Sequence, residues 1–400
     1  DYIRSIFFDN ENNAWISSKN SNVIKINLDG KNQKIEYYET NGNTINGFIQ
    51  LPSKRVIGMG IYGLYRFENG RAKLYDLFST DFEMDQLAEV WSGEIYDGKF
   101  YAGTHKNSIW EIGLEAFEKS SLIGEINPIF KQNPVWAIYN DKENNRLWIG
   151  TGSGLYYKNK NSWTKWDHPK FGSPAIWHIL ANKNGEGFYI GTTNQGLYLI
   201  DPYKNIVNKI GSDRGLTEMS VSGIGFDKEG TFWVATSNGL FARPKNSEYF
   251  RLYKRENGLP TLDFNFKGMG ISKNQQVFFS TKFGLVTPSE KVDFIETEPP
   301  SPIIRSVKIQ EIEIFSDPFS VSDFEVPYFN NYITFDFINP AWHTVFTGAF
   351  RYRLNGLDTS WIRSDIRDGK ASFAGLNAGK YELEVQFSAN EKIWSKPTLL

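Results

Sequence analysis

Apolar and polar residues alternate in short runs along most of the chain, and turn-forming residues separate the runs. The stretch "LWIGTGSGLYYK", residues 147–158, shows the unit: an apolar strand, a turn of small residues and a second apolar strand. Alternation with a period of two is typical of half-buried strands, and long stretches with the helical period of about 3.6 residues are missing. The pattern predicts an all-β chain.

The same pair of strands recurs along the first three quarters of the sequence. The related pairs lie at 14–26, 56–67, 100–112, 188–200, 232–243 and 277–288. A glycine loop that binds phosphate occurs once and leads into a helix, whereas this motif recurs and leads into strands. We therefore interpret Gly150–Gly154 as a turn and expect its glycines to serve the turn geometry.

A further strand precedes each pair, and its second residue repeats at spacings of 42, 45, 45, 41, 45 and 45 residues. These second residues are Arg4, Asn46, Trp91, Trp136, Trp177, Ser222 and Lys267. Four strands in about 44 residues are typical of a β-propeller blade, and seven such units close a ring without exposed sheet edges. We predict a seven-bladed β-propeller over residues 1–297.

The last hundred residues have a different pattern. The segment "ETEPPSPI" at 296–303 contains three prolines and is typical of a linker. Beyond it lie short strand-like runs, and "YELEVQF" at 381–387 alternates cleanly between polar and apolar residues. We predict an immunoglobulin-like β-sandwich over residues 298–400.

Composition and charge exclude several classes of function. The 400 residues carry a net charge of −2, which gives no electrostatic footprint for nucleic acid or an anionic membrane. There is no cysteine, so disulfides and cysteine-ligated metals are excluded. No apolar run approaches the roughly 20 residues of a membrane helix, and no signal peptide is visible. We expect no cofactor and no bound metal.

Two sets of motifs resemble one family. The repeat D-x-x-G-x-x-W-I/V-G/A-T-x-x-G-L-Y/F, seen most clearly at 224–243 and 138–158, resembles the regulator-propeller repeat of bacterial, Bacteroides-type hybrid two-component sensors. The runs at 350–362 and 376–390, with Phe373 at an aromatic position, resemble the Tyr-rich Y_Y_Y module that follows those propellers.

The resemblance implies a role and a location. It implies a periplasmic segment of an inner-membrane sensor that detects an oligosaccharide and signals by rearrangement of a homodimer. Membrane contact would then pass through a helix outside this chain. Any histidine kinase activity would also lie outside it, so we expect no catalysis here.

The repeated second positions supply the candidate ligand site. Trp91, Trp136 and Trp177 fall on successive blades, where the innermost strands line the channel. Aromatic faces bind the C–H faces of sugars, and cationic or amide side chains bind hydroxyls and carboxylates. The candidate residues are Trp91, Trp136, Trp177, Arg4, Lys267, Asn46 and His178. The alternative is that the tryptophans pack between blades as core.

Two other functions remain open. A carbohydrate-active propeller enzyme, a lyase or glycosidase, would need two acidic side chains in one pocket. Glu218 lies four residues before Ser222, and Asp263 lies four residues before Lys267, so these two acids are the candidates. A protein-interaction scaffold would instead expose a broad apolar patch. The Asp of the repeat is expected to cap its turn.

Overall fold

The computed structural model describes most of the chain. The described residues are 2–19, 22–27, 34–77, 89–105, 107–118, 121–122, 124–131, 133–159, 162–183, 186–288, 299–315, 324–330, 332–340, 349–358, 360–365, 369–388 and 393–400. The chain divides into two compact units, which are described separately: residues 1–211 with 216–292, and residues 212–215 with 293–400. The boundary predicted between residues 297 and 298 lies outside the described residues.

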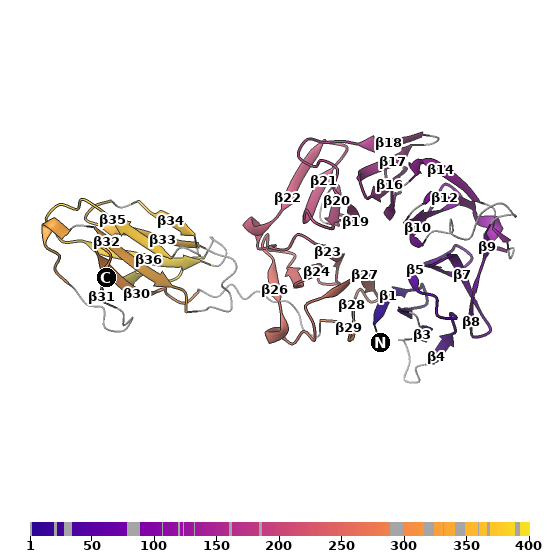
Figure 1. Ribbon diagram of the computed structural model, residues 1–400, viewed down its shortest axis with the longest axis horizontal. Coiled ribbons are helices and arrows are strands. Elements are labelled where there is room, and N and C mark those ends of the chain that lie inside the picture. Colours follow the sequence, from indigo (N-terminus) through magenta and orange to yellow (C-terminus); the bar gives the residue numbers. More distant parts are fainter. Residues whose placement is uncertain are drawn as a thin grey trace. The chain divides into compact units, whose positions relative to one another are not determined.

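The first unit is a ring of antiparallel sheets, and the first strand of each sheet is innermost (Figure 1). Blade 1 contains β1 (Ile3–Phe8), β2 (Asn13–Ser18), β3 (Val23–Asn27) and β4 (Ile35–Tyr38). Blade 2 contains β5 (Ile45–Gln50), β6 (Val56–Gly60), β7 (Gly63–Glu68) and β8 (Arg71–Leu74). Blade 3 contains β10 (Val90–Tyr96), β11 (Lys99–Thr104), β12 (Asn107–Gly113) and β14 (Gly124–Lys131).

The remaining blades repeat this order. Blade 4 contains β15 (Val135–Asp141), β16 (Arg146–Thr151), β17 (Gly154–Asn159) and β18 (Ser162–Trp166). Blade 5 contains β19 (Ile176–Ala181), β20 (Phe188–Thr192), β21 (Leu197–Asp201) and β22 (Ile206–Ile210). Blade 6 contains β23 (Val221–Phe226), β24 (Phe232–Thr236), β25 (Gly239–Arg243) and β26 (Arg251–Tyr253). Blade 7 contains β27 (Phe264–Ile271), β28 (Val277–Thr281) and β29 (Gly284–Val286) in the part that is described.

Short elements complete this unit, and side-chain contacts close the ring. The short elements are β9 (Asp76–Leu77), β13 (Ser121–Leu122), η2 (Leu114–Glu118) and η4 (Arg255–Asn257). The short helix η3 (Ser212–Arg214) falls among residues 212–215, which belong to the second unit. At closure β1 lies beside β27 (Figure 1), where the Asn265 amide donates to the Ile3 carbonyl and the rings of Phe8 and Phe278 are 5.1 Å apart. Seven of the sheets formed by the described residues are thus blades of one ring, which confirms the predicted propeller.

The glycine run at 150–154 serves two purposes. Gly154 has a φ of 118°, a conformation that glycine adopts without strain, so the turn prediction is confirmed there. Gly150 instead lies within β16, where an added Cβ would sit 2.4 Å from a side-chain carbon of Ile176 in the next blade. This glycine therefore permits close packing between blades, a role that the turn interpretation missed.

The threonine of the repeat closes each turn with the same hydrogen bond. The Thr151 hydroxyl donates to the Gly154 carbonyl oxygen at 2.9 Å. The equivalent hydroxyl bonds join Thr192 to Gly196, Thr236 to Gly239 and Thr281 to Gly284, at 2.7, 2.8 and 2.9 Å. The repeat therefore conserves the hydrogen-bonding residues of the turn as well as the pattern of apolar residues in the strands.

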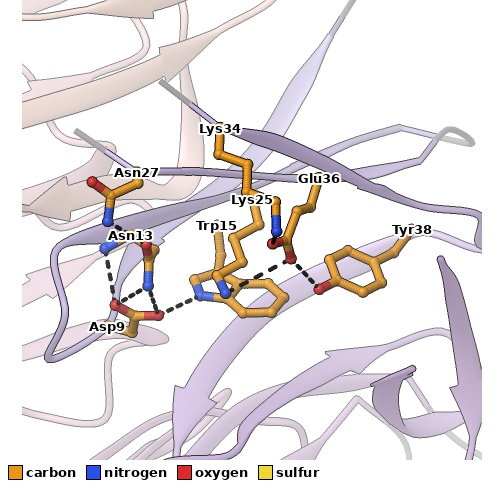
Figure 2. A network of polar contacts seen from close by, with 8 residues as sticks. All are labelled: Asp9, Asn13, Trp15, Lys25, Asn27, Lys34, Glu36 and Tyr38. Atoms are coloured by element: carbon orange, nitrogen blue, oxygen red, sulfur yellow. Dashed lines mark hydrogen bonds and ion pairs between the residues drawn. The ribbon is translucent and has the colours of Figure 1, made fainter. Parts of the chain in front are cut away.

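The aspartate of the repeat joins the first turn of a blade to its core. In blade 1, Asp9 accepts the backbone N–H groups of Glu11 and Asn13 at 3.0 and 2.9 Å. It also accepts the indole N–H of Trp15 at 2.9 Å (Figure 2). Burial opposes ionisation of Asp9, but these hydrogen bonds outweigh it and lower the pKa of the carboxyl. The expectation that the aspartate caps its turn is confirmed.

The second unit is a sandwich of two four-stranded sheets, ordered β31-β30-β32-β35 and β34-β33-β36-β37. Its elements are β30 (Ile303–Ile309), β31 (Ile312–Phe315), η5 (Tyr328–Asn330), β32 (Ile333–Ile338), β33 (Ala349–Asn355), β34 (Ile362–Asp365), β35 (Lys370–Phe373), β36 (Glu382–Ser388) and β37 (Thr398–Leu399). Leu383, Val385 and Phe387 point into the core, as the alternation predicts, and Phe373 packs there too.

Candidate functional site

A β-bulge turns the repeated second residue out of the strand alternation. In blades 1 to 6 the inner strand shifts register between its first and third residues, for example between Val135 and Ala137 in blade 4. The first residue of β15 is fully buried, whereas the bulged Trp136 is half-buried. A bulge of this kind re-aims one side chain, which explains how successive blades present the residue to the channel.

Blade 7 departs from this geometry, and one prediction is wrong there. In blade 7, Phe264 pairs with Thr281 and Met269 with Phe279, so β27 advances five residues while β28 advances two. In blade 6, β23 advances three residues, from Val221 to Ile224, while β24 advances two. The inner strand of blade 7 therefore has two extra residues. Asn265, not Lys267, therefore holds the repeated second position. Lys267 lies in the two extra residues, with a φ of 58°. The 45-residue spacing between Ser222 and Lys267 includes these two extra residues, so the spacing alone aligned Lys267 with Ser222 incorrectly.

The bulged tryptophans stack on one another. The rings of Trp136 and Trp177 are stacked with centroids 5.0 Å apart, and Phe266 stacks on Trp177 at 4.2 Å. Trp91 meets Trp177 edge to face at 5.7 Å. We call these four residues the aromatic cluster. The cluster does not match the interpretation of the tryptophans as core between blades, because the rings contact each other. It does not fully match the interpretation as a sugar site either, because Trp177 packs against the rings of Trp136, Trp91 and Phe266.

Lys267 crosses from blade 7 to blades 3 and 4. Its Nζ donates to the Trp91 carbonyl oxygen at 2.8 Å and to the Trp136 carbonyl oxygen. Burial, together with the nearby guanidinium of Arg4, lowers the pKa of the Lys267 ammonium to about 7. The insertion in β27 has thus placed a cation against two backbone carbonyls on other blades.

Arg4 and Asn46 lie beside the aromatic cluster. The Arg4 guanidinium carbon is 4.5 Å from the centroid of the Trp91 ring, and its Nε donates to the Asn46 side-chain oxygen at 3.2 Å. The Asn46 amide donates in turn to the Val90 carbonyl at 3.3 Å. The sequence-predicted residues Arg4, Asn46 and Trp91 are therefore brought together in one group.

His178 faces the same channel and is held neutral. Its Nε2 lies 2.8 Å from the Ser222 carbonyl oxygen, and because a carbonyl only accepts, Nε2 carries the proton. Burial and the positive charge of Lys267 lower the pKa of His178 to about 3. The imidazole therefore presents an unprotonated Nδ1 at neutral pH.

A cavity of about 290 Å³ lies in the channel next to these groups; we call it the channel cavity. Polar lining comes from Ser5, Asn46, Ser92, His178 and Lys267. Apolar lining comes from aliphatic and methionine side chains and from aromatic rings: Ile6, Met59, Ala137, Ile138, Ile179, Ile224, Met269, Phe7, Phe48, Trp91 and Trp177. The volume is near the lower end for small-molecule sites.

We call Glu89, Trp91, His105 and Trp136 the channel mouth. Glu89 precedes β10, Trp91 and Trp136 are the bulged residues of β10 and β15, and His105 follows β11. The His105 ring is exposed, with its centroid 6.4 Å from that of Trp91 and 6.3 Å from that of Trp136. The Trp91 indole N–H donates to a Glu89 carboxylate oxygen at 3.0 Å. The exposed His105 thus lies beside the half-buried Glu89, Trp91 and Trp136.

The candidate acids do not form the expected equivalent pair. Glu218 lies four residues before the bulged Ser222, but Asp263 lies only two residues before the equivalent Asn265. The equivalence assumed from the sequence is therefore wrong, again because of the insertion in β27. Glu218 accepts a hydrogen bond from the Asn238 amide at 2.8 Å, and Asp263 is exposed.

The residues that the structure describes hold neither a metal-binding cluster nor a membrane-spanning helix. Among them, three or more histidine, aspartate or glutamate side chains never gather in a group that could hold a metal ion. None of their helices is long and apolar enough to cross a membrane.

The fold defines the class: an all-β protein with a propeller and a sandwich-like C-terminal module. Comparison with known families gives the particular modules. Residues 129–153 match the two component regulator propeller model and residues 349–400 match the Y_Y_Y domain model. The chain therefore contains regulator-propeller repeats and a Y_Y_Y domain, as the sequence motifs predicted.

Whole-chain comparisons give the same picture. Histidine kinase P4 of Formosa agariphila is 21% identical over 344 residues, a match that covers 81% of this chain and 24% of that protein. The extracellular domain of a hybrid two-component system of B. thetaiotaomicron matches with a TM-score of 0.59 at 16% identity, over 100% of this chain and 56% of that one. The chain thus spans about a quarter of its curated relative and about half of that extracellular domain.

A streptogramin B lyase structure also matches, with a TM-score of 0.54 at 12% identity, over 72% of this chain and 93% of that chain. At such identities the likeness shows a shared fold alone. The family models add what the fold does not show: a two component regulator propeller and a Y_Y_Y domain in one chain.

Proposed function

We propose that this chain is a periplasmic ligand-sensing segment of a hybrid two-component sensor histidine kinase. The observation that carries the proposal is the joint presence of regulator-propeller repeats and a Y_Y_Y domain in one chain. Propellers alone occur in enzymes and in binding proteins, so the fold by itself would not decide between them. The kinase chemistry belongs to regions outside this chain.

The ligand we propose is an oligosaccharide bound at the channel mouth. The exposed His105 lies between Trp91 and Trp136, and Glu89 supplies a carboxylate beside them. Aromatic faces with adjacent hydrogen-bonding groups are the usual chemistry of sugar recognition. Because Trp177 is stacked on two protein rings, we place the sugar against the exposed side of the cluster and not inside the channel.

The signal we propose is a change in the arrangement of two protomers. Ligand binding shifts an equilibrium only as far as its affinities for the two arrangements differ. The Y_Y_Y module would pass the favoured arrangement to a membrane helix outside this chain.

The test is thermal unfolding of the purified chain with a panel of neutral oligosaccharides, followed by product analysis of each sample. A ligand that binds only the folded state raises the midpoint; at 100 times Kd the stabilisation is about 2.7 kcal/mol. Trp136→Ala should abolish the rise. Trp163→Ala, which changes a half-buried tryptophan on the outer strand β18, should retain it.

Each outcome decides something. A higher midpoint with intact sugar supports the sensor. Cleaved sugar supports a carbohydrate-active enzyme instead. No shift with any sugar contradicts oligosaccharide binding by this segment, and an unchanged shift in Trp136→Ala contradicts the proposed place of binding.

A further inference from the structure

We propose that the channel cavity is a second binding site, and that it takes a small organic carboxylate with an apolar body. The carboxylate would bind the Lys267 ammonium, and the apolar body would contact the aliphatic wall formed by Ile138, Ile179 and Ile224. The channel cavity shares Trp91 with the channel mouth, and the inference stands whether or not an oligosaccharide binds at the mouth.

The first argument is an unbalanced charge. Lys267 lines the cavity, and its hydrogen-bond partners among the described residues are the uncharged carbonyl oxygens of Trp91 and Trp136. The charged neighbour that affects it most is another cation, Arg4. A buried cation without a carboxylate is costly, so an anion next to it gains the charge-assisted bond that the fold leaves unmade.

The second argument is the set of hydrogen-bond donors that the fold leaves unused. An ammonium has three N–H donors, and the two carbonyls use two of those of Lys267. Among the described residues, the buried indole N–H groups of Trp136 and Trp177 and the buried Ser222 hydroxyl have no hydrogen-bond partner. Of these three residues, Trp177 lines the cavity. Buried polar groups are nearly always paired in native proteins, so its unpaired indole N–H and the third donor of Lys267 point to an acceptor-rich ligand.

The third argument is size and polarity. The cavity measures about 290 Å³, which suits a small molecule and is too small for an oligosaccharide. Beyond Lys267, Asn46, His178 and the serines Ser5 and Ser92, most of the residues that line it are apolar, some aliphatic and some aromatic. The ligand must therefore combine one anionic end with an apolar body, and inorganic anions such as sulfate would leave the apolar wall without a partner.

The protonation of Lys267 gives the site a signature in pH. Its pKa is lowered to about 7, and a bound carboxylate would raise it, so binding above about pH 7 takes up a proton and weakens as the pH rises. The other titratable groups near it are Arg4 on β1, which stays charged, His178 on β19, whose pKa of about 3 keeps it neutral, and Glu89 before β10, which contacts Trp91.

The experiment is isothermal titration of the full chain with hexanoate and benzoate, with hexan-1-ol as the neutral control. Hexanoate is expected to bind, and hexan-1-ol to bind at least about tenfold more weakly because it lacks the charge-assisted bond. Titration in two buffers of different ionisation enthalpy at about pH 8 should show proton uptake for hexanoate.

Variants locate the site. Lys267→Met removes the cation and Ile179→Phe fills the cavity while keeping the cation; both are expected to lose hexanoate binding at least about tenfold. Lys282→Met changes an exposed lysine in the same blade and should bind as the wild type does. Circular dichroism and the unliganded midpoint show whether each variant is folded.

The proposal is overturned if neither carboxylate binds to the wild type, or if folded Lys267→Met binds hexanoate as tightly as the wild type. Equal binding of hexanoate and hexan-1-ol, without proton uptake, would also overturn it, and this comparison needs no variant. A failure here leaves the neutral oligosaccharide test unaffected, because that test uses ligands without a carboxylate.

Discussion

Blades 6 and 7 are neighbours in the ring, yet they use the same sequence unit differently. Blade 6 follows the repeat closely: Asp227 accepts the indole N–H of Trp233 at 2.7 Å, and β23 has the ordinary bulge. Blade 7 has Ser272 at the capping position, a half-buried Phe278 where blade 6 has Trp233, and two extra residues in β27. Blade 6, which follows the repeat, keeps the hydrogen bonds that stabilise its core. In blade 7, the two extra residues of β27 place Phe266 and Lys267 in the channel.

The largest expected effect separates the cores of the two blades. Trp233 is 2% exposed, so Trp233→Ala should lower the free energy of unfolding by about 3–5 kcal/mol. Phe278→Ala, at the equivalent position of blade 7, should cost about 1–2 kcal/mol because its ring is already partly in water. Urea unfolding of both variants measures the difference, and equal losses would contradict the comparison.

The next effect concerns the capping residues. Asp227→Ala removes a charged acceptor from the Trp233 indole and from the Thr231 backbone N–H, and should cost about 2–3 kcal/mol. Ser272→Ala removes a single neutral bond to the Gln276 backbone N–H and should cost about 1 kcal/mol. Chemical denaturation again gives both values. A larger loss for Ser272→Ala would show that blade 7, not blade 6, depends more on its cap.

The third prediction uses pH to isolate the insertion in blade 7. The pKa of Lys267 is about 7 in the folded chain and has the ordinary value of 10.5 when unfolded, so between these values the unfolded chain binds one more proton. The stability of the wild type should therefore rise relative to Lys267→Met from about pH 7 to about pH 10, by on the order of 1–3 kcal/mol. Lys282→Met is the control and should track the wild type; parallel curves for all three would exclude a buried ammonium.

The smallest expected difference is in the turns that the two blades share. The Thr236 and Thr281 hydroxyls donate to glycine carbonyls at 2.8 and 2.9 Å. Thr236→Val and Thr281→Val should each cost about 1 kcal/mol, with no measurable difference between them. Thermal unfolding would check this, and a clear inequality would mean that the turns also differ in strength.

The regular features of the fold could be predicted from the sequence because they depend on local chemistry. Alternation, the glycine turns and the capping aspartate each act within one blade, so their recurrence in the sequence shows their recurrence in the fold. The strand "YELEVQF" likewise shows its buried face directly. The candidate site was predicted in part: Arg4, Asn46, Trp91, Trp136 and Trp177 do hold the repeated second position.

The sequence by itself thus determined an all-β chain with a repeated blade and a second, differently patterned module, because those properties follow from short-range periodicity. Only the tertiary structure showed that β27 is longer than its counterparts, that Asn265 takes the place assigned to Lys267, and that Phe266 joins the tryptophans. Spacing along a chain cannot locate an insertion within a strand, whereas pairing with β28 does. The channel is assembled from residues on every blade, and its charges, stacking and cavity exist only once the ring has closed.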